Sequence, residues 1–142
     1  MRFACRNFGL SDLPRRGLAL HEAPLEVLLL DIEAELSIWD EGRVAWSEKS
    51  FPVADLAYQL ALWLQGPASQ QSFELDSMQT DAGLIRIASS DGGWRIGSDF
   101  TPDFWTSPVA WDALVAEIKQ FDRSVRGGVT AMGIEPSFIP AV

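Results

Sequence analysis

The chain has 142 residues, of which 47% are apolar and 22% are charged, and it shows no internal repeat, so we expect one domain over residues 1–142. Its net charge of −9 argues against binding to nucleic acids or to anionic membranes, because both require a positively charged surface. A single cysteine excludes a disulfide framework within the chain, and we recognise neither a signal peptide nor an apolar run of membrane-spanning length, so we expect a cytoplasmic protein.

The first third of the chain predicts three strands. Residues 2–8 alternate loosely between polar and apolar side chains, and a polar stretch with prolines and glycines over 9–24 predicts a long loop. Residues 25–39 give the strongest strand pattern, because an apolar beginning passes into strict alternation. An acidic turn with a glycine over 40–42 predicts a hairpin that leads to the next strand, over 43–48.

The middle of the chain predicts a helix and then a meander. The helix has Pro52 in its first turn and an apolar stripe at spacings of three and four residues. Gly66, in a left-handed conformation, and Pro67 are expected to end it. Three short strands with two hairpin-like turns follow as an antiparallel meander: strands at 73–78, 84–89 and 94–99, and turns at 81–83 and 91–93.

The last part of the chain predicts a second helix. An irregular loop over 101–106 precedes it, Ser107 is expected to cap it, and Pro108 suits its first position. Gly127 and Gly128 are expected to end this helix, and an extended tail that docks on the domain follows from about residue 129. The inner stripe of the helix consists of Trp111, Leu114, Val115, Ile118, Phe121 and Val125.

These elements predict an α+β fold of the order β-ββ-α-βββ-α. Strand runs with hairpin turns, separated by single helices, are typical of an antiparallel sheet whose helices pack together on one face. We therefore expect one antiparallel sheet of about five or six strands, with both helices on the same side.

Acidic side chains alternate with apolar ones along the strongest predicted strand. Asp31, Glu33 and Glu35 are expected on one face at intervals of about 6–7 Å, with the apolar residues on the other face. A straight row of carboxylates diverges, which does not suit a Mg²⁺ or Ca²⁺ site, and a flat sheet offers no cleft for a catalytic carboxylate pair. The row is therefore either a solvated face or a docking surface for a basic partner.

Further acids and an aromatic pair are expected on the meander. Glu74 and Asp76 are expected to point outward from the first strand of the meander. Arg86 and Arg95 lie on the neighbouring strands, so part of this negative charge is expected to be neutralised. Asp99 and Asp103 lie beside Phe104 and Trp105. Aromatic rings next to acids are typical of an interface hot spot, although these rings can equally close the end of the core. The predicted partner-binding residues are Asp31, Glu33, Glu35, Glu74, Asp76, Asp99, Asp103 and Trp105.

No catalytic or cofactor-binding set is apparent. His21 is the one histidine, so a histidine metal cluster is excluded by count, and no serine lies in a nucleophile-elbow pattern. Gly92 and Gly93 lack the lysine and the following helix of a phosphate-binding loop. We therefore predict a protein that is not an enzyme and that binds no metal or cofactor.

A resemblance covers most of residues 1–125 and rests on three segments: LLLDIEAELSIWDEGRVAWSEKSFPVADLAYQLALWL, FELDSM and GGWRIGS. In these segments the chain resembles small actinobacterial proteins grouped as a domain of unknown function, and this resemblance implies no activity and no functional residue. In size, acidity and α+β layout the chain is also similar to immunity proteins of bacterial polymorphic toxin systems.

The sequence therefore predicts a cytoplasmic binding protein for a basic protein partner, with an immunity-type inhibitor of a basic toxin as its specific form. Electrostatic steering by the acidic surface would speed association with such a partner. Two alternatives stay open: an acidic secretion or folding chaperone, which would favour a dimer, and a small-ligand-binding protein or enzyme with a tryptophan-lined pocket.

Overall fold

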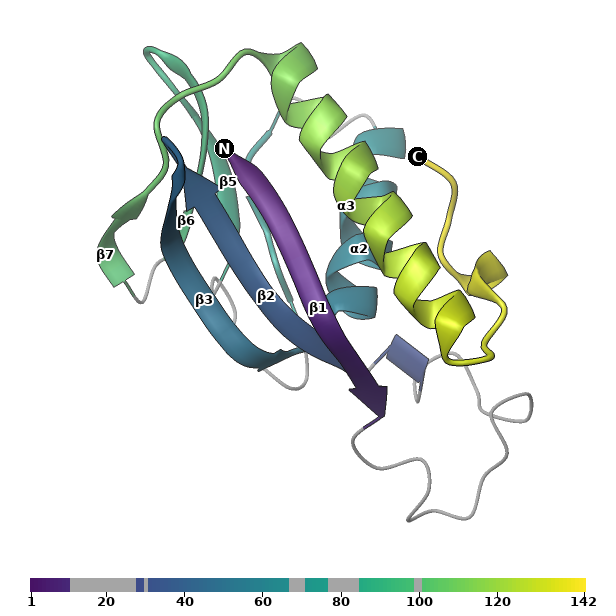
Figure 1. Ribbon diagram of the computed structural model, residues 1–142. Coiled ribbons are helices and arrows are strands. Elements are labelled where there is room, and N and C mark those ends of the chain that lie inside the picture. Colours follow the sequence, from purple (N-terminus) through teal and green to yellow (C-terminus); the bar gives the residue numbers. More distant parts are fainter. Residues whose placement is uncertain (11–27, 30, 67–70, 77–84, 99–100) are drawn as a thin grey trace.

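The computed structural model describes residues 1–10, 28–29, 31–66, 71–76, 85–98 and 101–142, except for the side chains of 101–103. The α+β class is confirmed (Figure 1). In chain order the elements are β1 (Arg2–Leu10), β2 (Ile32–Asp40), β3 (Arg43–Phe51), α2 (Val53–Gln65), β4 (Phe73–Glu74), β5 (Arg86–Ser90), β6 (Gly93–Ser98), β7 (Thr101–Trp105), α3 (Trp111–Ala131) and the 3₁₀ turn η4 (Pro136–Phe138).

The strands form two antiparallel sheets, and the prediction of one sheet is wrong. Sheet A has the order β1-β2-β3, and sheet B has the order β4-β5-β6-β7. Alternation and turn residues indicate strands and the hairpins that join them, but they carry no information on whether separate hairpins join edge to edge. The predicted irregular loop over 101–106 is largely the fourth strand of sheet B, β7.

Two of the predicted hairpins are present with two-residue loops. Asp40 pairs with Arg43 across the first loop, whose residues Glu41 and Gly42 have φ angles of 53° and 81°. Positive φ at both positions is the type I′ geometry that matches the twist of a hairpin. The 91–93 turn joins β5 to β6, whereas the predicted turn at 81–83 lies outside the described residues.

One hydrophobic core joins the two sheets and the two helices. Figure 1 shows α2 and α3 on one side of sheet A, with sheet B behind it. The inward residues of β2 are Ile32, Ala34, Leu36 and Ile38, and all four are buried. Phe3 of β1 meets Phe121 of α3 with ring centroids 5.1 Å apart, so the N-terminal strand is fixed against the last helix.

The strand predicted over 25–39 begins later than expected. Leu28, Leu29 and Asp31 are helical, and β2 starts only at Ile32. The apolar run before the alternating segment fits a buried helical turn as well as it fits a strand, and periodicity alone does not distinguish the two.

The first predicted helix is present as α2, but it ends differently. Pro52 precedes it as expected, whereas Gly66 has φ −87° and ψ 165°, which is extended and not left-handed. Its backbone N–H still donates to the carbonyl of Leu62 at 3.1 Å.

The second predicted helix is shifted towards the C-terminus. Ser107 does not cap it, because Val109 pairs with Trp94 as a short β-bridge and α3 starts only at Trp111. This bridge satisfies backbone groups that a helix would have used.

Gly127 and Gly128 do not end α3, which continues to Ala131. Its end is a Schellman motif: Gly133 has φ 82°, its N–H donates to the carbonyl of Thr130, and the N–H of Ile134 donates to the carbonyl of Val129. The side chains of Val129 and Ile134 are both buried, as this motif favours. The tail therefore starts near residue 132, and it is folded against the helices.

Candidate functional site

The open face of sheet A is the surface of the three-stranded sheet that points away from α2 and α3. No described element covers it, and it faces the viewer in Figure 1. The side chains that give this face its character are Arg2 and Arg6 from β1, Glu33, Glu35 and Trp39 from β2, and Val44 and Lys49 from β3.

Three hollows run along this face. The central one has a volume of about 350 Å³, and small side chains (Ala4, Ser37 and Ser47) lie along it. A second, of about 310 Å³, adjoins it through Arg2 and Trp39 and reaches the β2–β3 turn. The third, of about 160 Å³, is at the opposite end of the strands. Small residues between larger ones therefore shape an open surface that can receive protruding side chains of another protein.

The predicted site residues did not include Trp39 or its neighbours on this face, Arg2 and Val44. The guanidinium of Arg2 lies 5.1 Å from the ring centroid of Trp39, within the range of a cation–π contact. Val44, which pairs with Trp39, has 46% of its surface exposed. The alternation along β2 already placed Trp39 on the same face as Glu33 and Glu35, so the signal was present in the sequence.

The acidic row on β2 is flanked by bases on both sides. Two nitrogens of Arg6 donate hydrogen bonds to one carboxylate oxygen of Glu35, at 2.9 and 2.7 Å. Lys49 lines the same hollow as Glu33. The sequence assigned Glu33 and Glu35 to the outward face correctly, but it did not show that β2 is the central strand between two strands that bear bases. The open face of sheet A is therefore of mixed charge and not acidic.

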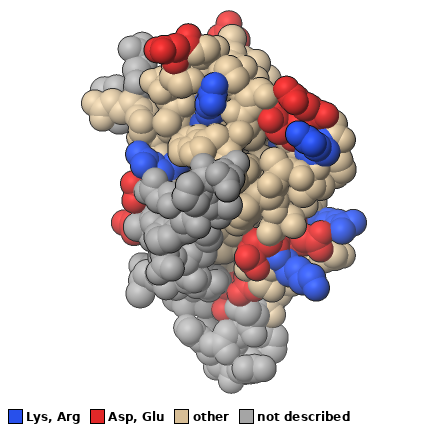
Figure 2. All heavy atoms as spheres, turned by 90° about the vertical axis from the view of Figure 1, so that its left-hand side faces the viewer, with Lys and Arg blue, Asp and Glu red and all other residues tan. Residues whose placement is uncertain are grey.

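Asp31 does not belong to this row. Its side chain is 3% exposed, because the residue lies in the helical turn before β2 and not on the strand. Figure 2 shows the same mixture of charges on another side of the molecule, where acidic and basic side chains lie next to one another.

The other predicted site residues lie on sheet B. The register places Glu74, Arg86, Gly97 and Trp105 in one row across four strands. Part of the expected neutralisation is present, because Nε of Arg86 lies 4.0 Å from a carboxylate oxygen of Glu74. The indole of Trp105 packs over Gly97, where it would meet any β-carbon, so this ring is half-buried in the row.

The remaining predicted residues contribute less to a common site. Asp76 is exposed, and the side-chain amide of Gln59 clamps its backbone N–H and carbonyl, at 3.0 and 2.6 Å. Asp99, the side chain of Asp103 and His21 lie outside the described residues. The predicted set is thus divided between two sheets.

The β2–β3 turn, the β5–β6 turn and the start of α3 lie at one end of the molecule in Figure 1, and their acidic residues, Asp40, Glu41, Asp91 and Asp112, define what we call the acidic end. Asp40 lies 4.0 Å from the N-terminal amine of Met1 there. The segment before α3 assembles it. The backbone N–H of Ser107 donates to a carboxylate oxygen of Asp40 at 3.0 Å, and its hydroxyl donates to a carboxylate oxygen of Glu41 at 3.0 Å. The next residue, Pro108, packs against the turn that carries Asp91. These residues are distant in sequence, so no local pattern indicated their proximity.

The tryptophan-rich part of the core is filled by the rings themselves. Trp63 of α2 contacts Trp94 and Trp111 with centroid distances of 5.9 and 5.5 Å, and those two rings lie 4.9 Å apart. None of the three hollows on sheet A is lined by these side chains. The cluster packs the helices against sheet B.

Within the described residues, no three His, Cys, Asp or Glu side chains are grouped so that they could hold a metal ion. Across that same part of the chain, no helix combines the length and the hydropathy needed to span a bilayer.

Cys5 packs against the core, and burial raises the pKa of its thiol from the ordinary value of 9.0 to about 11. The thiolate is the reactive form, so alkylation by iodoacetamide at pH 8 should be roughly a hundredfold slower than for a thiol of ordinary pKa. Because the folded pKa exceeds the unfolded one, burial of the neutral thiol stabilises the fold below pH 9, and this stabilisation is lost as the pH rises towards about 11.

Alkylation rates measured from pH 7 to about 11 test this prediction, and the same protein unfolded in guanidinium chloride is the control. A folded protein that reacts as fast as the unfolded chain at pH 8 would contradict the burial of this thiol.

The comparisons with known proteins bear on the family alone. No curated protein and no solved structure matches the chain. The likeness to immunity proteins has no support among these comparisons, whereas the resemblance to a domain of unknown function is confirmed by a family model that matches residues 16–129. The chain belongs to the family described as Domain of unknown function (DUF7878).

Proposed function

We propose that this chain is a non-enzymatic binding protein that docks another protein on the open face of sheet A, and that its net negative charge favours a positively charged partner. The observation that carries the proposal is the row of three hollows along a sheet face that no described element covers, continuous with Trp39 and next to the acidic end. An inhibitor of a basic toxin is the specific form of this function that the acidity and the size favour.

Trp39, Arg2 and Val44 would supply most of the binding energy. Tryptophan and arginine are the residue types that dominate interface hot spots, because they bury a large area and still make directed contacts. The stacking of Arg2 on Trp39 holds both side chains in place before the partner arrives, so little rotamer freedom remains to be lost on binding.

Charge would act mainly on the rate of association. The net charge of −9 and the acidic end attract a basic protein over a distance of about one Debye length, roughly 10 Å at 0.1 M salt. On the face itself, Glu35 is already paired with Arg6, so this pair contributes little to the electrostatic attraction of a partner. We therefore expect salt to slow association more than it speeds dissociation.

The test uses the basic proteins encoded beside this chain as candidate partners and measures binding kinetics on a sensor surface. Truncation by Trp39→Ala should weaken binding roughly thirtyfold or more, as loss of a hot spot of about 2 kcal/mol does. Leu62→Ala is the matched control, because Leu62 is 47% exposed but belongs to α2, outside the proposed face.

A pair of charge reversals tests the steering. Asp91→Lys at the acidic end should lower the association rate several-fold at low salt, whereas Glu135→Lys, an equal change in net charge on the tail, should have a smaller effect. Association that does not depend on salt, or equal losses from Trp39→Ala and Leu62→Ala, would contradict the proposal.

A further inference from the structure

The C-terminal tail lies back over the helices. After Gly133 the chain reverses, and residues 134–141 return past α3 towards α2, with η4 in between. The side chains of Ile134 and Ile139 are 6% and 2% exposed. The tail is thus held at two apolar points, separated by a segment of mostly half-buried and exposed side chains.

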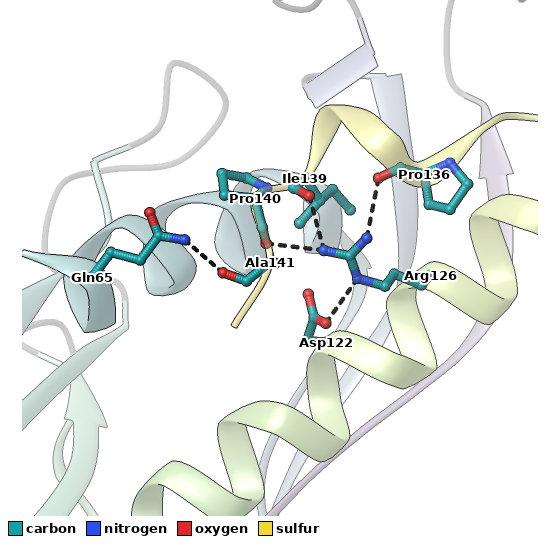
Figure 3. Close-up of polar contacts among 7 residues, drawn as sticks. All are labelled: Gln65, Asp122, Arg126, Pro136, Ile139, Pro140 and Ala141. Carbon is teal, nitrogen blue, oxygen red and sulfur yellow. Dashed lines mark hydrogen bonds and ion pairs between the residues drawn. The ribbon is translucent and has the colours of Figure 1, made fainter.

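Among the described residues, the polar contacts that hold the tail on the helices go to its backbone (Figure 3). Arg126 donates to the carbonyl oxygens of Pro136, Ile139 and Pro140, at 3.4, 2.8 and 2.9 Å. Gln65 of α2 donates to the carbonyl of Ala141 at 2.5 Å. Every peptide segment has such carbonyls, so this recognition depends on the path of the backbone and only weakly on the sequence.

We call Gln65, Asp122 and Arg126, with the apolar surface under Ile139, the tail seat. Asp122 positions the arginine, because one of its carboxylate oxygens accepts from Nε of Arg126 at 2.8 Å. The other oxygen, Oδ1, is buried and has no hydrogen-bond donor among the described residues. A buried acceptor without a donor is unfavourable, so the fit between the seat and the chain's own tail is incomplete.

The family match gives an independent indication. It ends at residue 129, so all three polar residues of the tail seat lie inside the matched region, whereas the tail lies outside it. The polar residues of the tail seat are thus part of the matched region.

We propose that the tail seat is a binding site for an extended peptide segment, and that the chain's own tail is a displaceable occupant of it. The segment presents backbone carbonyls to Arg126 and an apolar side chain at the place of Ile139. Displacement by a segment of a partner protein would release residues 134–141 while the sheets and helices stay folded.

The test uses a fluorescent peptide of residues 132–142 and measures anisotropy with the full-length protein. Ile139→Asp should open the seat, because a carboxylate does not dock in an apolar site, so this variant should bind the peptide at least tenfold more tightly than the wild type does. In the wild type, the tethered tail competes at an effective concentration of about 1 mM.

Two further variants locate the site. Adding Arg126→Ala to Ile139→Asp should weaken peptide binding at least tenfold, whereas adding Arg123→Ala, an exposed arginine on the same helix, should leave it unchanged. A folded Ile139→Asp variant that does not bind the peptide, or that binds it equally with and without Arg126, would overturn the proposal.

If Ile139→Asp fails to fold, hydrogen exchange in the wild type tests whether the tail opens while the helices and sheets stay folded. The amides of Ile134 and Ile139, which are bonded to the carbonyls of Val129 and Pro136, should exchange at least tenfold faster than the slowest amides of α3. If they exchange only as fast as those of α3, the tail opens only with global unfolding, and it is a fixed part of the core.

Discussion

Replacement of Trp63 by alanine is expected to lower the free energy of unfolding by about 3–5 kcal/mol, the range for large aromatic truncations in a packed core. Trp63 is 8% exposed, and its ring meets three other rings, with centroids 5.6 Å from Phe73, 5.9 Å from Trp94 and 5.5 Å from Trp111. Its indole N–H also donates to the carbonyl of Gln71 at 3.2 Å, and truncation removes that bond.

Denaturant unfolding followed by circular dichroism measures this loss, because tryptophan fluorescence would change with the substitution itself. Leu62→Ala is the matched control: it is the preceding residue of α2 and is 47% exposed, so the change should stay within about 0.5 kcal/mol. A loss below about 1 kcal/mol for Trp63→Ala would show that this cluster does not hold α2 against sheet B.

The two neighbouring glycines of α3 are expected to respond to alanine with opposite signs. A β-carbon at Gly127 meets nothing within 4 Å, so Gly127→Ala should stabilise the protein by about 0.5–1 kcal/mol through higher helix propensity. A β-carbon at Gly128 would overlap the ring of Phe8 on β1, and Gly128→Ala should destabilise by about 1–3 kcal/mol.

A double-mutant cycle with Phe8→Ala separates the two effects. If the overlap with Phe8 causes the loss, Gly128→Ala in the Phe8→Ala background should behave like Gly127→Ala and become neutral or stabilising. Thermal and denaturant unfolding of the four proteins give the coupling. Equal stabilisation by both glycine substitutions in the wild type would contradict the close packing of β1 on α3.

This glycine pair shows why local rules failed at the end of α3. Adjacent glycines are common just after a helix, and each disfavours a helix interior by about 1 kcal/mol relative to alanine. Here, however, the next turn brings Val129 into the core, and Gly128 admits Phe8. The residue at which α3 does end, Gly133, is also a glycine. Only its positive φ and its backbone hydrogen bonds distinguish it from Gly127 and Gly128.

In the candidate site, too, local patterns predicted some features and missed others. The outward direction of Glu33 and Glu35 followed from the period of the strand, and it is confirmed. That period could not show that Arg6 would lie opposite Glu35, because cross-strand register depends on residues that are distant in sequence. The acidic end likewise depends on contacts of Ser107 and Pro108 with two separate hairpin turns.

The sequence by itself determined the α+β class, the hairpins at 40–43 and 90–93, the buried stripes of both helices and the outward face of β2. Each of these follows from periods and turn residues within about fifteen neighbouring positions, where backbone geometry fixes the direction of every side chain. The tertiary structure alone decided that the strands divide into two sheets, that bases flank the acidic row, and that the tail folds back onto Arg126. These features depend on which distant segments bury their apolar surface together, and many pairings satisfy the same local pattern.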